Sequence, residues 1–150
     1  MANLASPLQI GARSGGWLMS QQVYHFNTAS GTPLYLHFKT NVLTSVEKIF
    51  MIEAEGYNYG TGTPILAAWG LYTTGASSNT VSSKGLQSIS GLTADGIYKS
   101  SDGYACIRAY NSSSHYYTGF TLHVYSSYYY TPDTVAITSA TQTSNSGSYY

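Results

Sequence analysis

The chain has 150 residues, and its six basic and six acidic side chains give a formal net charge of zero. Low charge combined with 15% aromatic residues is not the composition of a disordered chain, and this length is typical of one domain with its own core. The few Lys and Arg residues are scattered, whereas binding a phosphate backbone requires clustered positive charge, so we expect no nucleic-acid partner.

The N-terminal residues do not form a basic stretch followed by an apolar one, and no apolar run has the length needed to cross a bilayer. We therefore expect synthesis in the cytoplasm and no membrane insertion. The single cysteine, Cys106, excludes an intrachain disulfide. Little charge with sixteen Tyr and many Ser, Thr and Gly residues is nevertheless typical of an exposed, assembly-forming β-protein. A protein built inside a cell and released with a particle combines these properties.

The first elements are an arm and two strands. Residues 1–15 contain Pro and Gly without a hydrophobic period, which predicts an extended arm that docks on another surface. A strand is predicted over residues 17–26. A second is predicted over residues 34–39, where Leu34, Leu36 and Phe38 alternate with polar residues.

Residues 48–55 are apolar on both faces at their start and charged on one face by their end, which indicates a strand that emerges at a sheet edge. A short helix would also fit, but the glycine-rich residues 56–62 end the segment too soon for one. The apolar run after Pro64 predicts another strand, with a bulge or close backbone approach at Gly70. A polar loop is predicted at residues 74–83.

Two Asp-Gly pairs, Asp95-Gly96 and Asp102-Gly103, predict type I′ turns around a short strand. Residues 104–125 then predict a hairpin, because apolar residues alternate with polar ones on both limbs around a Ser-, Tyr- and Gly-rich loop at 111–119. A last short strand is predicted around Val135 and Ile137.

Eight or nine short strands with frequent turn signals predict an all-β fold, an antiparallel β-sandwich of which the jelly roll is one form. The expected organisation is a single sandwich domain over residues 16–140, preceded by the docking arm at 1–15 and followed by a polar C-terminal tail at 141–150.

No pattern indicates catalysis. Glu53 and Glu55 face the same side of a strand, which a glycosidase pair could use, but they also fit as solvated charges that protect a sheet edge from aggregation. His37 and His123 could approach one another across strands to hold a metal, yet no close ligand spacing accompanies them. Cys106 fits a small buried hydrophobe. We expect no enzymatic activity, no metal and no cofactor.

The remaining signal is a set of aromatic residues in predicted loops. Tyr, Ser, Gly and Asn are favoured in binding loops, and Tyr is also enriched where subunits pack together. These residues therefore predict a surface that binds a partner or a ligand. The expected partner is a sister subunit or a neighbouring capsid protein, and the expected ligand is a sugar. The candidate residues are Tyr57, Tyr59, Tyr110, His115, Tyr116, Tyr117, Tyr125, Tyr128, Tyr129 and Tyr130.

Four segments, LHFKTN at 36–41, MIEAEGYNYG at 51–60, SSDGYACIRAY at 100–110 and YYTGFTL at 116–122, resemble short virion structural proteins of marine cyanophages and related uncultured tailed phages. The resemblance implies a capsid decoration protein, a knob or cement displayed on the virion surface and partnered by the major capsid protein. The alternative that it implies is the tip domain of a tail fibre or spike, with fibre subunits as partners and a host surface glycan as ligand. A homotrimer is a further expectation. The resemblance assigns no functional residue.

Overall fold

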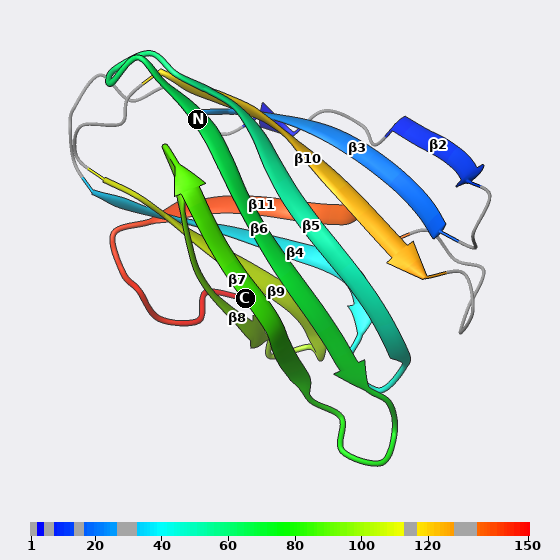
Figure 1. The fold of residues 1–150 in the computed structure, drawn as a ribbon. Helices are drawn as coiled ribbons and strands as arrows, with labels where there is room; N and C mark the ends of the chain where they lie inside the picture. The colour runs from blue at the N-terminus through cyan, green and yellow to red at the C-terminus, as the bar shows by residue number, and fades with distance from the viewer. Residues whose placement is uncertain (1–2, 5–7, 14–16, 27–32, 113–116, 128–134) are drawn as a thin grey trace.

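The computed structural model describes residues 3–4, 8–13, 17–26, 33–112, 117–127 and 135–150. Within these residues the chain forms eleven β-strands and no helix. Two antiparallel sheets lie face to face as a sandwich (Figure 1). Nine long strands, five in one sheet and four in the other, form the sandwich, as the alternation of apolar residues predicts.

The two sheets differ in size. The large sheet contains, in spatial order, β3 (Trp17–Phe26), β10 (Thr118–Ser127), β5 (Glu47–Asn58), β6 (Thr63–Thr74) and β7 (Val81–Ser90). The small sheet contains, in spatial order, β11 (Ile137–Thr143), β4 (Leu34–Leu43), β9 (Tyr104–Asn111) and β8 (Thr93–Lys99). Early strands thus pair with late ones, as in a jelly roll, and local hairpins complete each sheet.

Two short strands, β1 (Asn3–Leu4) and β2 (Leu8–Arg13), both pair with β3. Because β10 pairs with β3 along its whole length, the two short strands share the other edge of β3. The described part of the predicted arm therefore pairs with its own sheet.

Alternate residues of the strands meet between the sheets. In β5, Phe50, Ile52 and Ala54 are buried while their neighbours face outwards. The rings of Tyr24 and Phe38, which belong to different sheets, lie 5.0 Å apart with an edge-to-face geometry that aromatic pairs favour. Every second residue is buried because successive side chains of a strand point to opposite faces, and the apolar residues of the sequence follow the same alternation.

Some polar side chains bridge the two sheets, among them those of Gln22 and Trp69. Gln22 of β3 is 2% exposed. Its amide donates to the Ile137 carbonyl at 2.8 Å and accepts from the Ile137 amide at 2.7 Å. The indole of Trp69, in β6, donates to the Arg108 carbonyl of β9 at 3.1 Å. These bonds tie the sheets together and leave the polar atoms that form them satisfied.

The predicted hairpin at 104–125 is wrong. Its first limb, β9, lies in the small sheet between β4 and β8, and its second limb, β10, lies in the large sheet between β3 and β5. The connection crosses from one sheet to the other. Alternation shows only which side of a strand is apolar, and a strand in either sheet of a sandwich buries one side.

The Asp-Gly pairs behave differently from one another. Asp102-Gly103 lies in the β8–β9 turn, where Gly103 has a φ of 91°. Asp95-Gly96 lies inside β8 at a register shift, so the turn predicted there is wrong. The irregularity predicted at Gly70 is confirmed, because the β6–β7 register shifts between this residue and Leu71.

β4 and β5 extend beyond their predicted limits. β5 continues through Gly56 to Asn58, and a Cβ atom at Gly56 would lie 2.2 Å from the Gly119 carbonyl oxygen. Glycine there allows the close approach of β10 rather than ending the strand. The predicted polar loop is shorter than expected, because β7 begins at Val81.

Replacing Gln22 by alanine tests the bridge between the sheets. The substitution leaves two buried main-chain groups of Ile137 without their partner. An unpaired buried polar group costs about 1–3 kcal/mol, so we expect the free energy of unfolding to fall by about 2–5 kcal/mol in urea denaturation. Gln21→Ala is the matched control. Gln21 lies on the outer face and bonds His123, and its loss should cost less than about 1.5 kcal/mol. Equal losses in the two variants would contradict the bridging role.

Candidate functional site

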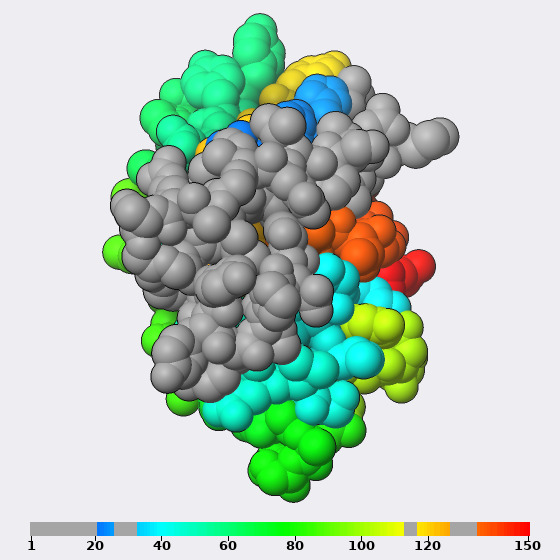
Figure 2. Space-filling model, turned by 90° about the vertical axis from the view of Figure 1, so that its right-hand side faces the viewer, coloured from blue at the N-terminus to red at the C-terminus, as the bar shows by residue number. Residues whose placement is uncertain are grey.

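Three of the predicted tyrosines meet at one end of the large sheet. Tyr57 and Tyr59 lie at the β5–β6 turn, and Tyr117 directly precedes β10. Their exposed fractions are 52%, 66% and 43%, and the rings of Tyr59 and Tyr117 lie 6.0 Å apart at 76°. Figure 2 shows the turn and the start of β10 side by side at the top of the molecule. We call these three residues the tyrosine end.

Main-chain and buried side-chain contacts hold the tyrosine end in place. The Tyr59 amide donates to the Tyr117 carbonyl at 3.4 Å. Beneath it, the buried Asn58 amide donates to the Thr118 hydroxyl at 3.1 Å. Tyr117 has a φ of 52°, a left-handed conformation that costs about 1–2 kcal/mol for a residue with a Cβ atom. Such backbone geometry is concentrated at functional sites.

Two other predicted tyrosines do not join this end. Tyr110 is half-buried and packs against Tyr35 of the small sheet, with ring centroids 5.1 Å apart. Tyr125 pairs with Met51, six residues along β5 from Tyr57, which is about 20 Å in a strand. The remaining candidates, His115, Tyr116, Tyr128, Tyr129 and Tyr130, lie outside the described residues.

Glu53 and Glu55 lie on the outer face of the large sheet, with both side chains on one side of β5 as predicted. The carboxylate of Glu55 lies 3.6 Å from Nε2 of His123, whose Nδ1 is 2.9 Å from the Gln21 amide. His37 belongs to β4 in the small sheet. The predicted approach of His37 and His123 is therefore wrong, because their strands lie in opposite sheets. The described ranges contain no group of three or more metal-ligating side chains.

A second site, which the sequence did not indicate, covers the outer face of the small sheet. Residues 144–150, which we call the strap, follow β11 and lie against this face. His37 is fully buried there although its neighbours along β4 on either side face the core. Its Nδ1 lies 3.0 Å from the Tyr98 hydroxyl, and its Nε2 lies 3.0 Å from the Thr143 hydroxyl. A single-sequence pattern cannot find this burial, since the strap arrives from a distant part of the chain.

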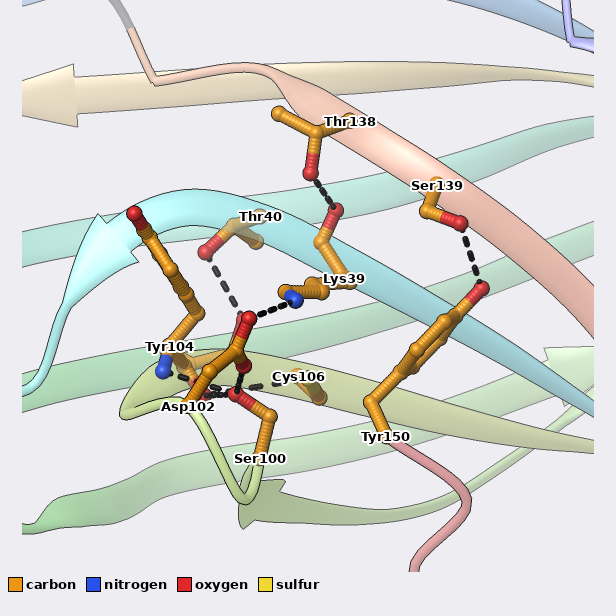
Figure 3. A network of polar contacts seen from close by, with 10 residues as sticks. Lys39, Thr40, Ser100, Asp102, Tyr104, Cys106, Thr138, Ser139 and Tyr150 are labelled. Atoms are coloured by element: carbon orange, nitrogen blue, oxygen red, sulfur yellow. Dashed lines mark hydrogen bonds and ion pairs between the residues drawn. The ribbon is translucent and has the colours of Figure 1, made fainter.

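Lys39 lies on the same face, two residues from His37 along β4. Its ammonium group forms an ion pair with Asp102 and lies 5.0 Å from the centre of the Tyr104 ring and 5.6 Å from that of Tyr150 (Figure 3). The hydrogen bond from Lys39, followed by that from Ser100, lowers the pKa of the Asp102 carboxyl. The positive charge of Lys39 is thus neutralised within the site.

Cys106 is buried, as the sequence predicts, but it projects from the outer side of β9 while Ala105 and Ile107 enter the core. Figure 3 shows it between the Ser100–Asp102 turn and Tyr150. Burial raises the pKa of its thiol to about 11. The thiol is therefore neutral and unreactive while the site stays closed.

The outer face of the large sheet carries a third feature, an exposed apolar strip made of Ile49, Met51 and Ile89. Two hollows adjoin it. One, of about 350 Å³, includes Ile49 and Tyr72 in its lining, and the other, of about 210 Å³, includes Met51 and Ile89. Exposed apolar side chains gathered on one face mark an interaction surface.

Comparison of the chain with protein-family models, curated proteins and solved structures finds no match. Among the residues that the structure describes, no helix is long and apolar enough to span a membrane.

Acid should destabilise the protein through His37. Burial, and after it the Arg108 guanidinium, lowers the pKa of His37, against smaller opposing effects of the Asn145 main chain and Asp95. The unfolded chain therefore binds a proton at residue 37 at a higher pH than the folded chain, and stability falls as the pH drops below about 6.5. Urea denaturation at about pH 7.5 and about pH 5.5 should show a smaller acid-induced loss in His37→Gln than in the wild type. The same loss in both proteins would exclude His37 as its source.

Proposed function

We propose that this chain is a structural protein of a bacteriophage virion, a decoration protein that docks on the capsid and is displayed on the head surface. The observation that carries this proposal is the exposed apolar strip on the outer face of the large sheet. Ile89 is 64% exposed, and Ile49 and Met51 are each more than a third exposed. A flat sheet face with such a strip suits docking on another protein.

Charge supports the same function. The strip is bordered by Glu47 and Glu53 on one strand and by Lys84 on another, and Lys84 lies 5.3 Å from the centre of the Tyr72 ring. An apolar centre with a charged rim is the usual anatomy of a protein interface. The resemblance to cyanophage virion proteins supports a capsid as the partner. The proposal includes no catalytic role.

The tyrosine end favours the second candidate function, a receptor-binding tip on a tail fibre or spike. Its three rings project at an end of the sandwich, where the docking of the sheet face would leave them accessible. Exposed tyrosines with adaptable polar neighbours contact ligands at low entropic cost. A host surface glycan is the proposed ligand of this alternative.

Cryo-electron microscopy of particles separates the two locations. Virions of the phage that encodes this chain should show its density over the head facets, and virions with Ile49→Asp and Met51→Asp should lose that density, because buried unpaired carboxylates oppose docking. The fraction of capsid sites that carry this protein should drop at least about tenfold, as expected when contacts at the centre of a protein interface are lost.

The matched control is Ala76→Asp with Ser78→Asp, which adds two carboxylates in the exposed β6–β7 loop and should leave occupancy unchanged. Density confined to the tail tip would reject decoration and support the alternative. Equal loss in the control would show that added charge, not the strip, is responsible.

The alternative predicts that the tyrosine end binds sugar. Tyr59→Ala and Tyr117→Ala should each weaken binding of the chain to extracted host surface polysaccharide, measured by biolayer interferometry, by about tenfold through the loss of ring stacking. Val46→Ala, which shortens an exposed side chain just before the start of β5, at the opposite end of that strand from Tyr57, is the control. Unchanged binding in the first two variants would remove the tyrosine end from this role.

A further inference from the structure

Several strands and turns contact the main chain of the strap and hold it on the small sheet. The Arg108 guanidinium donates to the Ser146 carbonyl and, at 3.4 Å, to the Gly147 carbonyl. The Ser101 amide donates to the Tyr150 carbonyl at 3.0 Å. Burial raises the pKa of the Tyr98 hydroxyl, and the main chain of Tyr149 and that of Tyr150 lower it by smaller amounts. Donors and acceptors on the sheet are thus arranged for an extended peptide.

Both tyrosines of the strap are recognised through their side chains as well. The ring centre of Tyr149 lies 5.8 Å from that of His37. The hydroxyl of Tyr150 lies 2.8 Å from the hydroxyl of Ser139, and its ring faces the ammonium of Lys39 (Figure 3). The sheet therefore distinguishes a Tyr-Tyr segment from one with small side chains.

The charges of this face match an uncharged peptide. Lys39 is paired with Asp102, and Arg108 with Asp95. The two basic groups are therefore neutralised before any ligand binds, which removes the attraction that an anion would need. The strap itself, with the sequence SNSGSYY, carries no charged side chain.

Most of the strap is exposed to solvent. Residues 144–149 are exposed and pair with no strand, and the Ser, Asn and Gly residues before the tyrosines have the composition of a flexible linker. In Figure 1 the chain turns back after β11 and returns towards β8 as a loop. Segments with few buried apolar contacts open at low free-energy cost.

We propose that the outer face of the small sheet is a peptide-binding site for a Ser- and Tyr-containing segment, and that it takes residues 144–150 from a second copy of the chain as well as from its own. A second copy supplies the same contacts as the covalently attached strap, so exchange loses none of them. Exchanged straps link neighbouring copies without using the apolar strip or the tyrosine end. This role does not depend on where the protein sits on a particle.

The first test uses full-length chains and a fluorescent synthetic peptide with the sequence of residues 144–150. Tyr149→Ala with Tyr150→Ala removes the side-chain contacts of the strap and frees the site, so this variant should bind the peptide at least about tenfold more tightly than the wild type does. A peptide with alanine at both tyrosine positions should not bind. Absence of binding to the folded variant, or equal binding of the alanine peptide, would overturn the proposal.

Cys106 reports the state of the site independently. Its thiol should react with a maleimide faster in the double variant than in the wild type, and the peptide should slow this reaction again. Circular dichroism establishes that the variant is folded. If the double variant does not fold, Tyr149→Ala carries the same two measurements. A reaction rate that the peptide does not change would contradict binding at this face.

Exchange between copies needs a separate measurement. A donor chain with Arg108→Gln keeps its strap but has an impaired site, and the double variant keeps its site but has no functional strap. Sedimentation velocity should find each protein alone as one species and their mixture as a 1:1 complex that excess peptide dissolves. Peptide binding without complex formation would restrict the strap to its own chain and reject the second copy as its source.

Discussion

The two sheets depend on the pairing of the few polar groups that lie between them. The Gln22 side chain hydrogen-bonds both the amide and the carbonyl of Ile137, and the Trp69 indole donates to the Arg108 carbonyl. An apolar layer alone lets two sheets slide, because hydrophobic contact has no direction, whereas hydrogen bonds specify one position. The bond to Ile137 places the start of β11 beneath β3.

The outer faces of the two sheets differ in what covers them. The large sheet leaves Ile49, Met51 and Ile89 exposed, while the small sheet is covered by the strap and has its basic groups paired with carboxylates. One face thus suits a foreign apolar partner, and the other suits an uncharged segment such as the one that lies on it. The proposed docking and the proposed exchange use opposite sides of the sandwich and are compatible in one molecule.

Much of the sandwich could be predicted because burial on one side imposes alternation on a strand. The strands at 34–43 and 47–58 follow this rule, and so do residues 21–25 of β3 and both limbs around residues 111–119. β7 does not, because most of its residues are exposed on both faces at the edge of the sheet, and an edge strand without a buried side has no period. Of the candidate site, the place of Tyr59 and Tyr117 outside the strands follows from loop composition. Their meeting with Tyr57 at one end of the sheet, and the position of Tyr125 far along β10, required the register.

The sequence by itself determined the fold class and the inward side of most strands, because both depend on local alternation of apolar and polar residues. The tertiary structure alone decided which sheet each strand joins. The limbs at 104–111 and 118–127 have the pattern of a hairpin, yet they belong to opposite sheets, since early strands, not each other, are their neighbours. It also decided the burial of His37 and the outer side of β9 on which Cys106 is buried. Both depend on residues 144–150 folding back from a distance in the chain that no local pattern encodes.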